Sequence, residues 1–304
     1  MSSQSRTGAV AVILGLVVGY GASGHAADPV ALRYEFTENQ VVSFESEHVS
    51  EFTTQAGQTV EKVTNSTRSW KQFRVVSVDS SGGAVLEPVL TRVQMQNQFN
   101  ELDPVQWDSQ TGDPPPQFSQ VAASLNRAVA RFHVKATGAL VKIEPIAADV
   151  PGLPEAAKRT DASMNFLVAF PEEPVAIGGT WKERFEVPVT LDNGLVQQVT
   201  VQRQYELVEM TDGIAKIRVR AVVLSPISDP KIELQLIQRT PAGEIQFDTT
   251  RGLLVSQSSK IDKTVLGAIG ADSRITALGT VTEKLVDAAQ SASAPRLLNA
   301  PNRK

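Results

Sequence analysis

Apolar and polar residues alternate along most of this chain, a pattern typical of β-strands. Bulky and β-branched side chains, which favour strands, recur from Trp70 to Val78, and a return run extends from Ala84 to Met95. Asp79-Ser-Ser-Gly-Gly83 lies between them and has the composition of a tight turn, because glycine tolerates positive φ and Asp and Ser bond their own backbone. We therefore predict a β-hairpin here.

Two other segments are predicted as strands, and a third is ambiguous. On a strand from Val41 to Phe52, Glu45 and Glu47 project from one face and His48 from the other, so the three side chains do not converge on one ion. The segment 273–286 is predicted as a closing strand that crosses back to the first part of the chain. The segment 232–238 fits a strand and a helix equally well.

The same plan appears twice along the sequence. Gln72-Phe-Arg-Val-Val-Ser-Val-Asp79 resembles Gln204-Tyr-Glu-Leu-Val-Glu-Met-Thr211, and a glycine turn follows each. Thr137-Gly-Ala-Leu-Val141 likewise resembles Arg251-Gly-Leu-Leu-Val255. The aromatic pair is offset by 132 positions (73 and 205) and the glycine pair by 114 (138 and 252). This predicts an internal duplication, with an insertion in the first copy.

The fold class predicted from these patterns is mainly β (α+β). It consists of two tandem curved antiparallel sheet units with one or two short helices. The first unit covers 30–145, with its insertion near 103–130, where apolar residues at helical spacing follow a triple proline. A linker over 146–176 includes a second possible helix at 154–168, the second unit covers 177–287, and 288–304 has the composition of a disordered tail.

The amino end has the pattern of a secretory signal peptide. Arg6 precedes a short apolar run from Gly8 to Val18, and Gly24-His-Ala26 offers small residues at the cleavage positions. The run is far shorter than the roughly 20 apolar residues of a membrane-spanning helix. We expect residues 1–26 to be removed on export, leaving a periplasmic or secreted protein without a transmembrane span.

Composition narrows the range of partners and of chemistry. Without Arg6 the chain retains 28 of its 29 Lys and Arg residues against 33 Asp and Glu, and this mild acidity argues against a nucleic-acid partner. There is no cysteine, so the chain has no disulfide, thiolate metal ligand or cysteine nucleophile. Of its three histidines, His48 and His133 remain after cleavage.

No recognised catalytic or cofactor motif occurs in the sequence. It contains no His-Glu-x-x-His helix, no Gly-x-Ser-x-Gly elbow and no glycine-rich phosphate loop. The closest cluster, Glu45-Ser-Glu47-His48, is interpreted as a solvated acidic face. We therefore predict no catalytic residue, no metal site and no cofactor.

The aromatic residues on or beside the predicted strands are the candidate ligand contacts. Two interpretations are open: they fill the core, or they line the concave face of a partly open sheet that holds a lipid or acyl chain beneath the short helices. The candidates are Trp70, Phe73, Trp107, Phe118, Trp181, Phe185 and Tyr205.

Several short segments resemble uncharacterised exported β-rich proteins of bacteria, of a planctomycete-type domain of unknown function. They are Leu32-Arg-Tyr-Glu-Phe36, Pro174-Val-Ala-Ile-Gly-Gly-Thr-Trp181 and Gly252-Leu-Leu-Val255. The likeness covers most of residues 30–286 and carries over no site residue. A weaker resemblance is to the periplasmic lipoprotein-carrier fold, an incomplete antiparallel barrel capped by helices, from which this chain departs in length and in its duplication.

These observations predict an exported, non-catalytic β protein that binds an apolar small molecule, a lipid or another envelope ligand. The alternative is an interaction or scaffold module that docks an envelope protein through an edge strand or the Glu45/Glu47 face. A further alternative is a hydrolase with an unrecognised carboxylate site, which would require two facing acids in a cleft.

Overall fold

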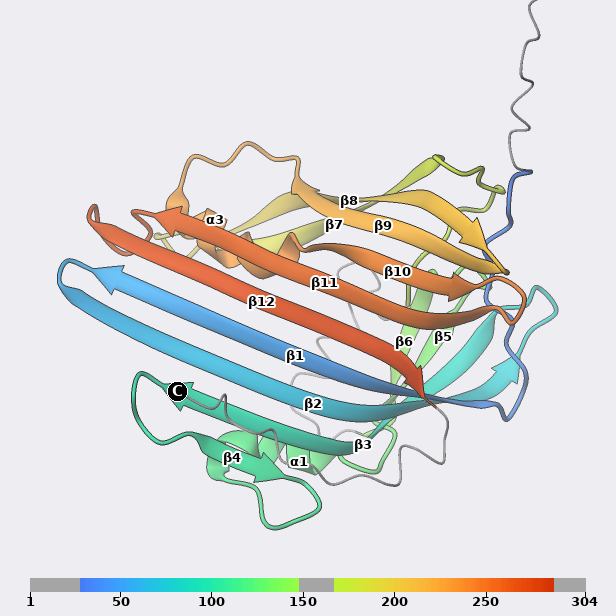
Figure 1. Cartoon of the computed structure of the whole chain (residues 1–304), viewed down its shortest axis with the longest axis horizontal. Coiled ribbons are helices and arrows are strands. Elements are labelled where there is room, and N and C mark those ends of the chain that lie inside the picture. Colours follow the sequence, from blue (N-terminus) through green and yellow to red (C-terminus); the bar gives the residue numbers. More distant parts are fainter. Residues whose placement is uncertain (1–27, 148–166, 287–304) are drawn as a thin grey trace, which may run out of the picture.

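The computed structural model describes residues 28–147 and 167–286, which form one large curved antiparallel sheet (Figure 1). The mainly β fold class is confirmed. The strands are β1 (Val41–Ala56), β2 (Thr59–Val78), β3 (Ala84–Phe99), β4 (Val105–Asp108), β5 (Ala130–Val134), β6 (Leu140–Pro145), β7 (Thr180–Thr190), β8 (Val196–Thr211), β9 (Ile214–Val223), β10 (Ala242–Asp248), β11 (Leu253–Leu266) and β12 (Ser273–Val286).

The two predicted units are halves of this single sheet. Its strand order is β6-β5-β3-β2-β1-β12-β11-β10-β9-β8-β7, with β4 paired to β3. Each half is an up-and-down meander, and β12 joins them by pairing with β1 from Ser43↔Val286 to Ala56↔Ser273. The predicted closing strand and the hairpin around 79–83 are both confirmed.

Matching β-bulges occur at equivalent positions of the two meanders. The register slips between Val75 and Ser77 in β2 and between Leu207 and Glu209 in β8, at the 132-residue offset of the predicted repeat. Val141 and Val255 are the residues skipped in the β5–β6 and β10–β11 pairings, each three positions after the turn glycine. Bulges are retained within families, so their agreement supports the duplication, which stays a prediction.

The segment before β1 lies between the two glycine turns of the repeat. Tyr34 donates its N–H to the carbonyl of Ala136 (2.7 Å), and Glu35 donates to that of Gly252 (3.1 Å). A Cβ on Gly252 would lie 2.2 Å from the Glu35 nitrogen, and one on Gly138 would lie 2.5 Å from the Tyr34 ring. Both turns therefore require glycine in order to hold this segment.

The helices are short. η1 (Pro116–Phe118) and α1 (Ser119–Ser124) follow the triple proline, and α1 ends earlier than the apolar spacing predicted. The ambiguous segment 232–238 is helical: α3 (Pro230–Leu236) begins after its cap Asp229 and continues into η3 (Ile237–Arg239). The second predicted helix falls almost wholly within 148–166, which, like the predicted signal peptide (1–26) and the predicted tail (288–304), lies outside the described residues.

The sheet curls far enough for distant strands to share a core. α3 contacts both β7 and β11, which are separated in the sheet by three other strands. At the other end, Phe44 and Phe73 of β1 and β2 pack in one cluster with Tyr205, Leu207 and Phe247 of β8 and β10. The concave face is thus filled near both ends, by α3 at one and by the segment before β1 at the other.

Candidate functional site

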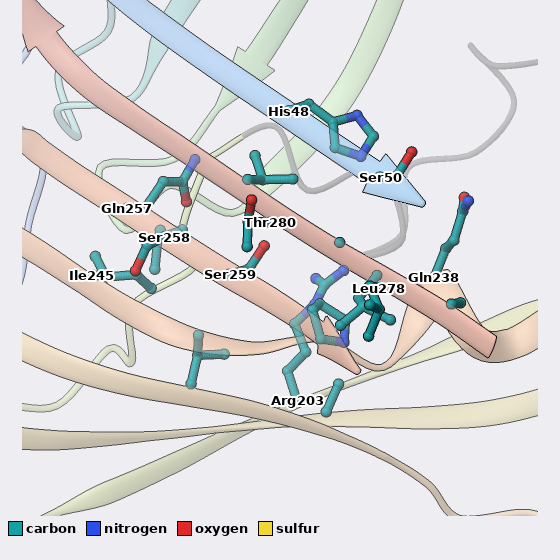
Figure 2. A pocket seen from close by; sticks show the side chains of 18 of the residues that line it. His48, Ser50, Arg203, Gln238, Ile245, Gln257, Ser258, Ser259, Leu278 and Thr280 are labelled. Atoms are coloured by element: carbon teal, nitrogen blue, oxygen red, sulfur yellow. The ribbon is translucent and has the colours of Figure 1, made fainter. Parts of the chain in front are cut away.

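A cavity of about 290 Å³ opens on the concave face, between the cluster around Phe44 and the end covered by η3. Its walls come from neighbouring strands of the sheet, β1, β12, β11, β10, β9 and β8, together with Gln238 of η3 and the following Pro241 (Figure 2). The cavity therefore spans the junction of the two half-sheets.

Strand alternation determines which side chains reach this space. On β1, His48, Ser50 and Phe52 line the cavity, while Glu45 pairs with Arg68 on the opposite face through Nε (2.6 Å). The prediction that His48 and Glu45 project from opposite faces is therefore confirmed. Glu47 is exposed on the same face as Glu45.

A glycine leaves the floor of the cavity open. Gly279 lies in β12 opposite Ser50 of β1 on one side and Ile261 of β11 on the other. A Cβ built on Gly279 would lie 3.9 Å from the Ser50 Cβ and 3.8 Å from the Ile261 Cβ, which is ordinary contact. Because both neighbours line the cavity, any side chain at Gly279 would enter the same space.

The two sides of the cavity differ in chemistry. Apart from Arg203 of β8, the β8–β10 side is apolar, with a surface formed by Tyr205, Val219, Ala221 and Ile245, and Ile261 extends this surface on β11. His48 and Ser50 of β1 and Gln257 and Ser259 of β11 supply hydrogen-bonding groups, with Gln238 at the η3 end, as the labelled side chains in Figure 2 show. An occupant with one apolar face and one polar edge fits this division.

Arg203 and Tyr205 are fixed by partners at the cavity wall. The Arg203 guanidinium lies 4.4 Å from the centre of the Phe185 ring and pairs with Glu183 at 3.2 Å. The Tyr205 hydroxyl donates to the same Glu183 carboxylate at 3.0 Å. Burial, followed by the charge of Glu183, raises the pKa of Tyr205, so this hydroxyl stays protonated at neutral pH.

The described lining of the cavity lacks the acid pair that a two-carboxylate hydrolase needs. None of the described residues that line the cavity is acidic, and a two-carboxylate hydrolase needs a facing pair. Within 28–147 and 167–286, no cluster of three or more His, Asp or Glu side chains could hold a metal ion. What the cavity supplies is apolar surface, hydrogen-bonding groups and the Arg203 guanidinium, which pairs with Glu183.

The seven aromatic candidates lie in separate parts of the structure. Tyr205 lines the cavity, and the ring of Trp181 stacks on it at 5.2 Å while donating Nε1–H to the Ala169 carbonyl. Phe185 is buried near α3, and Phe73 packs against Phe44 in the opposite cluster. Phe73, Trp181, Phe185 and Tyr205 therefore pack as core residues, and Tyr205 also lines the cavity.

Trp70, Trp107 and Phe118 lie away from this cavity. Trp70 pairs with Glu45 across β1 and β2, and both side chains lie on the face of the sheet away from the cavity. The Arg68 and Arg92 guanidiniums are 5.1 and 4.7 Å from the centre of the Trp70 ring. Trp107 stacks on Phe118 at 6.2 Å beneath α1.

Trp107 also borders a second hollow of about 280 Å³, beside Gln94 and Asp108. Burial raises the pKa of Asp108, but hydrogen bonds from Arg92 and Gln94 outweigh this and hold it below its usual value. The Arg92–Asp108 ion pair, at 2.7 Å, is itself buried. The Asp108 carboxylate is therefore part of a structural ion pair.

The polar residues of the concave cavity were missed by sequence reasoning. Ser50, Gln257, Ser259 and Gln238 come from separate elements and form no local motif. The only signal available was alternation, which predicted the facing direction of His48. His133, the other retained histidine, pairs with Glu144 at 3.2 Å outside this cavity.

No helix in the two described ranges is long and apolar enough to cross a bilayer.

No family model matches the chain, and no curated protein matches it. Among solved structures, it is similar to a chain from "Lipid-protein interactions in lipovitellin", with 12% identity and a TM-score of 0.48, over 83% of this chain and 26% of that one. It is also similar to DynF from the dynemicin biosynthesis pathway of Micromonospora chersina, with 9% identity and a TM-score of 0.22, over 87% and 89%. Neither likeness assigns a family or a ligand.

Proposed function

We propose that this chain is an exported, non-catalytic protein that binds an apolar or amphipathic small molecule in its concave cavity. The observation that supports this proposal is the open space over Gly279. The β8–β10 wall with its apolar side chains lies on one side of this space, and hydrogen-bonding groups lie on the other. Its volume of about 290 Å³ is at the lower end of the range for small-molecule sites.

Burial of the occupant's apolar surface supplies the affinity in this proposal. Removal of apolar surface from water contributes roughly 25 cal/mol per Å². Ser50, Ser259 and Gln257 fix the polar edge, because a buried polar group costs free energy unless it is hydrogen-bonded. The wall residues Tyr205 and Arg203 are held by Glu183, so this part of the wall is positioned by contacts within the chain.

Export is part of the proposal and is supported by the signal-peptide pattern of residues 1–26. The resemblance to exported bacterial β proteins points to the same compartment. An exported carrier or sensor of a poorly soluble molecule would need an enclosed apolar site of this kind.

A fluorescent fatty-acid probe tests the site. Gly279→Leu places a side chain in the cavity, whereas Thr282→Leu adds the same side chain at an exposed position of the same strand. We expect the wild type and Thr282→Leu to bind the probe alike, and Gly279→Leu to bind at least tenfold more weakly. Equal binding by all three proteins would place the probe elsewhere and remove the proposed site.

A further inference from the structure

The charges at the concave cavity are balanced within the chain or solvated by water. Of the described residues that line it, Arg203, His48 and Tyr205 are ionisable (Figure 2). The Arg203 and Glu183 side chains are only 12% and 21% exposed, and they pair at 3.2 Å. The Tyr205 hydroxyl donates to the same carboxylate and is uncharged at neutral pH. His48 is exposed, so water solvates its ring.

A second ion pair lies next to the cavity. Glu283 of β12 is opposite the lining residue Gln257 of β11 and is 5% exposed. It pairs with Lys71 and accepts the Gln257 Nε2–H at 3.3 Å. Lys263, opposite the lining residue Ala277, is exposed to water. No buried charge among these described residues therefore needs a counter-charge from an occupant.

A buried hydroxyl in the cavity does need a partner. Ser50 lines the cavity and is 7% exposed, and within 28–147 and 167–286 its hydroxyl takes part in no hydrogen bond. A buried polar group without a hydrogen bond costs free energy. Ser50 is opposite Gly279, so an occupant over the open floor reaches this hydroxyl. A hydroxyl can both donate and accept, so an alcohol, a carbonyl or an amide satisfies it.

A carboxylate in the same place would disturb the charge balance. It would face the Glu183 charge across Arg203 in a largely dehydrated wall, and it would lose its own hydration on entry. An uncharged polar group loses less hydration and still bonds Ser50. Selection against a wrong ligand by an unfavourable charge is a common source of specificity. The pairing of Arg203 with Glu183 therefore favours an uncharged occupant.

We propose that the occupant of the cavity is an uncharged amphiphile, a long-chain alcohol, ester or amide, whose polar group hydrogen-bonds to Ser50. This rests on the proposed function and adds the chemical class of the ligand. Glu183 is the specificity-determining residue, because it compensates the charge of Arg203. A fatty-acid probe still reports occupation of the cavity, and we expect it to bind more weakly than an uncharged analogue of the same length.

Displacement of the fluorescent fatty-acid probe by dodecanol and by dodecanoate tests this selectivity, because the two compounds share one chain length and differ in charge at pH 8. In the wild type, dodecanol should displace the probe at a concentration at least tenfold lower than dodecanoate. Glu183→Gln removes the charge that compensates Arg203, so this advantage should be lost. The matched control Glu206→Gln removes a carboxylate that pairs with Arg218 at 2.9 Å outside the cavity lining and should keep the wild-type ratio.

Two further variants separate charge from shape and locate the polar contact. Glu183→Gln combined with Arg203→Gln removes both charges, so the preference for dodecanol should return. Ser50→Ala should weaken dodecanol binding about fivefold, the usual effect of one hydrogen bond. The same change should leave the urea denaturation midpoint of the unliganded protein nearly unchanged, because the hydroxyl has no partner in the described part of the chain.

The outcomes distinguish the ligand class from the site itself. Dodecanoate that displaces the probe from the wild type as well as dodecanol does, a wild-type ratio in a folded Glu183→Gln, or unchanged dodecanol binding by Ser50→Ala would overturn the proposal. The cavity would still stand if Gly279→Leu weakened binding of both compounds. Binding of both compounds that is insensitive to Gly279→Leu would instead remove the site. If Glu183→Gln does not fold, the wild-type ratio and Ser50→Ala decide.

Discussion

At the scale of single residues, Trp181 is a test of how the core is packed. Its ring stacks on Tyr205 and meets Phe170 edge-on at 6.4 Å, and its Nε1–H is bonded to the Ala169 carbonyl. Trp181→Ala should lower the free energy of unfolding by about 3–5 kcal/mol, the usual cost of removing a packed aromatic side chain. Chemical denaturation measures this. Trp181→Phe should lose less, and an unchanged midpoint for Trp181→Ala would contradict the packing.

Gly252 combines a left-handed backbone with a close approach. Its φ is +60°, and an added Cβ would meet the Glu35 nitrogen. Gly57 has a similar φ of +58° with open space around it, so Gly57→Ala measures the backbone strain alone, on the order of 1 kcal/mol. Gly252→Ala should cost more in urea denaturation, because it also displaces the segment before β1. Equal losses would mean that this segment does not need the glycine.

Tyr34 links this segment to alkaline stability. Burial raises the pKa of its hydroxyl above the ordinary value near 10, and the hydroxyl accepts a hydrogen bond from the Val168 N–H at 3.2 Å. Because the folded pKa is the higher one, the stabilising contribution is complete below pH 10 and declines as the pH rises further. Unfolding midpoints between pH 8 and 11 should fall more steeply for the wild type than for Tyr34→Phe. Parallel slopes would contradict the burial of this hydroxyl.

At the scale of elements, α3 depends on its first residues. The Asp229 side chain accepts the Lys231 N–H at 2.8 Å, and Pro230 occupies the first turn. Asp229→Ala should cost about 1 kcal/mol, whereas Asp229→Asn keeps the cap and should cost little. Thermal unfolding of the pair measures the difference. Equal loss in both variants would indicate that charge, rather than capping, matters at this position.

Patterns of neighbouring residues predicted turns and the facing direction of side chains. The contacts between distant strands depend on strand register, which these patterns do not specify. The turn 79–83 and the opposite faces of Glu45 and His48 follow from residues close together in sequence, and both are confirmed. The 232–238 segment was ambiguous because seven residues fit either period, and the Asp229 cap with Pro230 favours the helix.

The cavity itself was beyond sequence reasoning. Ser50, Gly279 and Ile261 become neighbours only through the pairing of β12 with both β1 and β11. None of these residues carries a motif that identifies it as part of a site. Tyr205 was among the candidates because it is aromatic on a strand, a criterion that equally selects buried core residues such as Phe185.

At the scale of the whole molecule, one curved sheet has side chains packed on its concave face near both ends. A cavity remains between these two packed regions. The Phe44 cluster and the α3 cluster each bring distant strands together, and the cavity lies in the unfilled part of the concave face. A sheet of this length curls because its strands twist. The cavity in the concave face is therefore a property of the complete sheet, since both half-sheets contribute walls.

Native mass spectrometry of the protein purified from its own cell envelope tests the central claim most directly. The wild type should carry the added mass of one extractable apolar or amphipathic molecule on a chain beginning near position 27. Gly279→Leu, purified in the same way, should be folded and lack that mass. A wild-type protein that carries no added mass, and that also ignores the fatty-acid probe, would contradict the account.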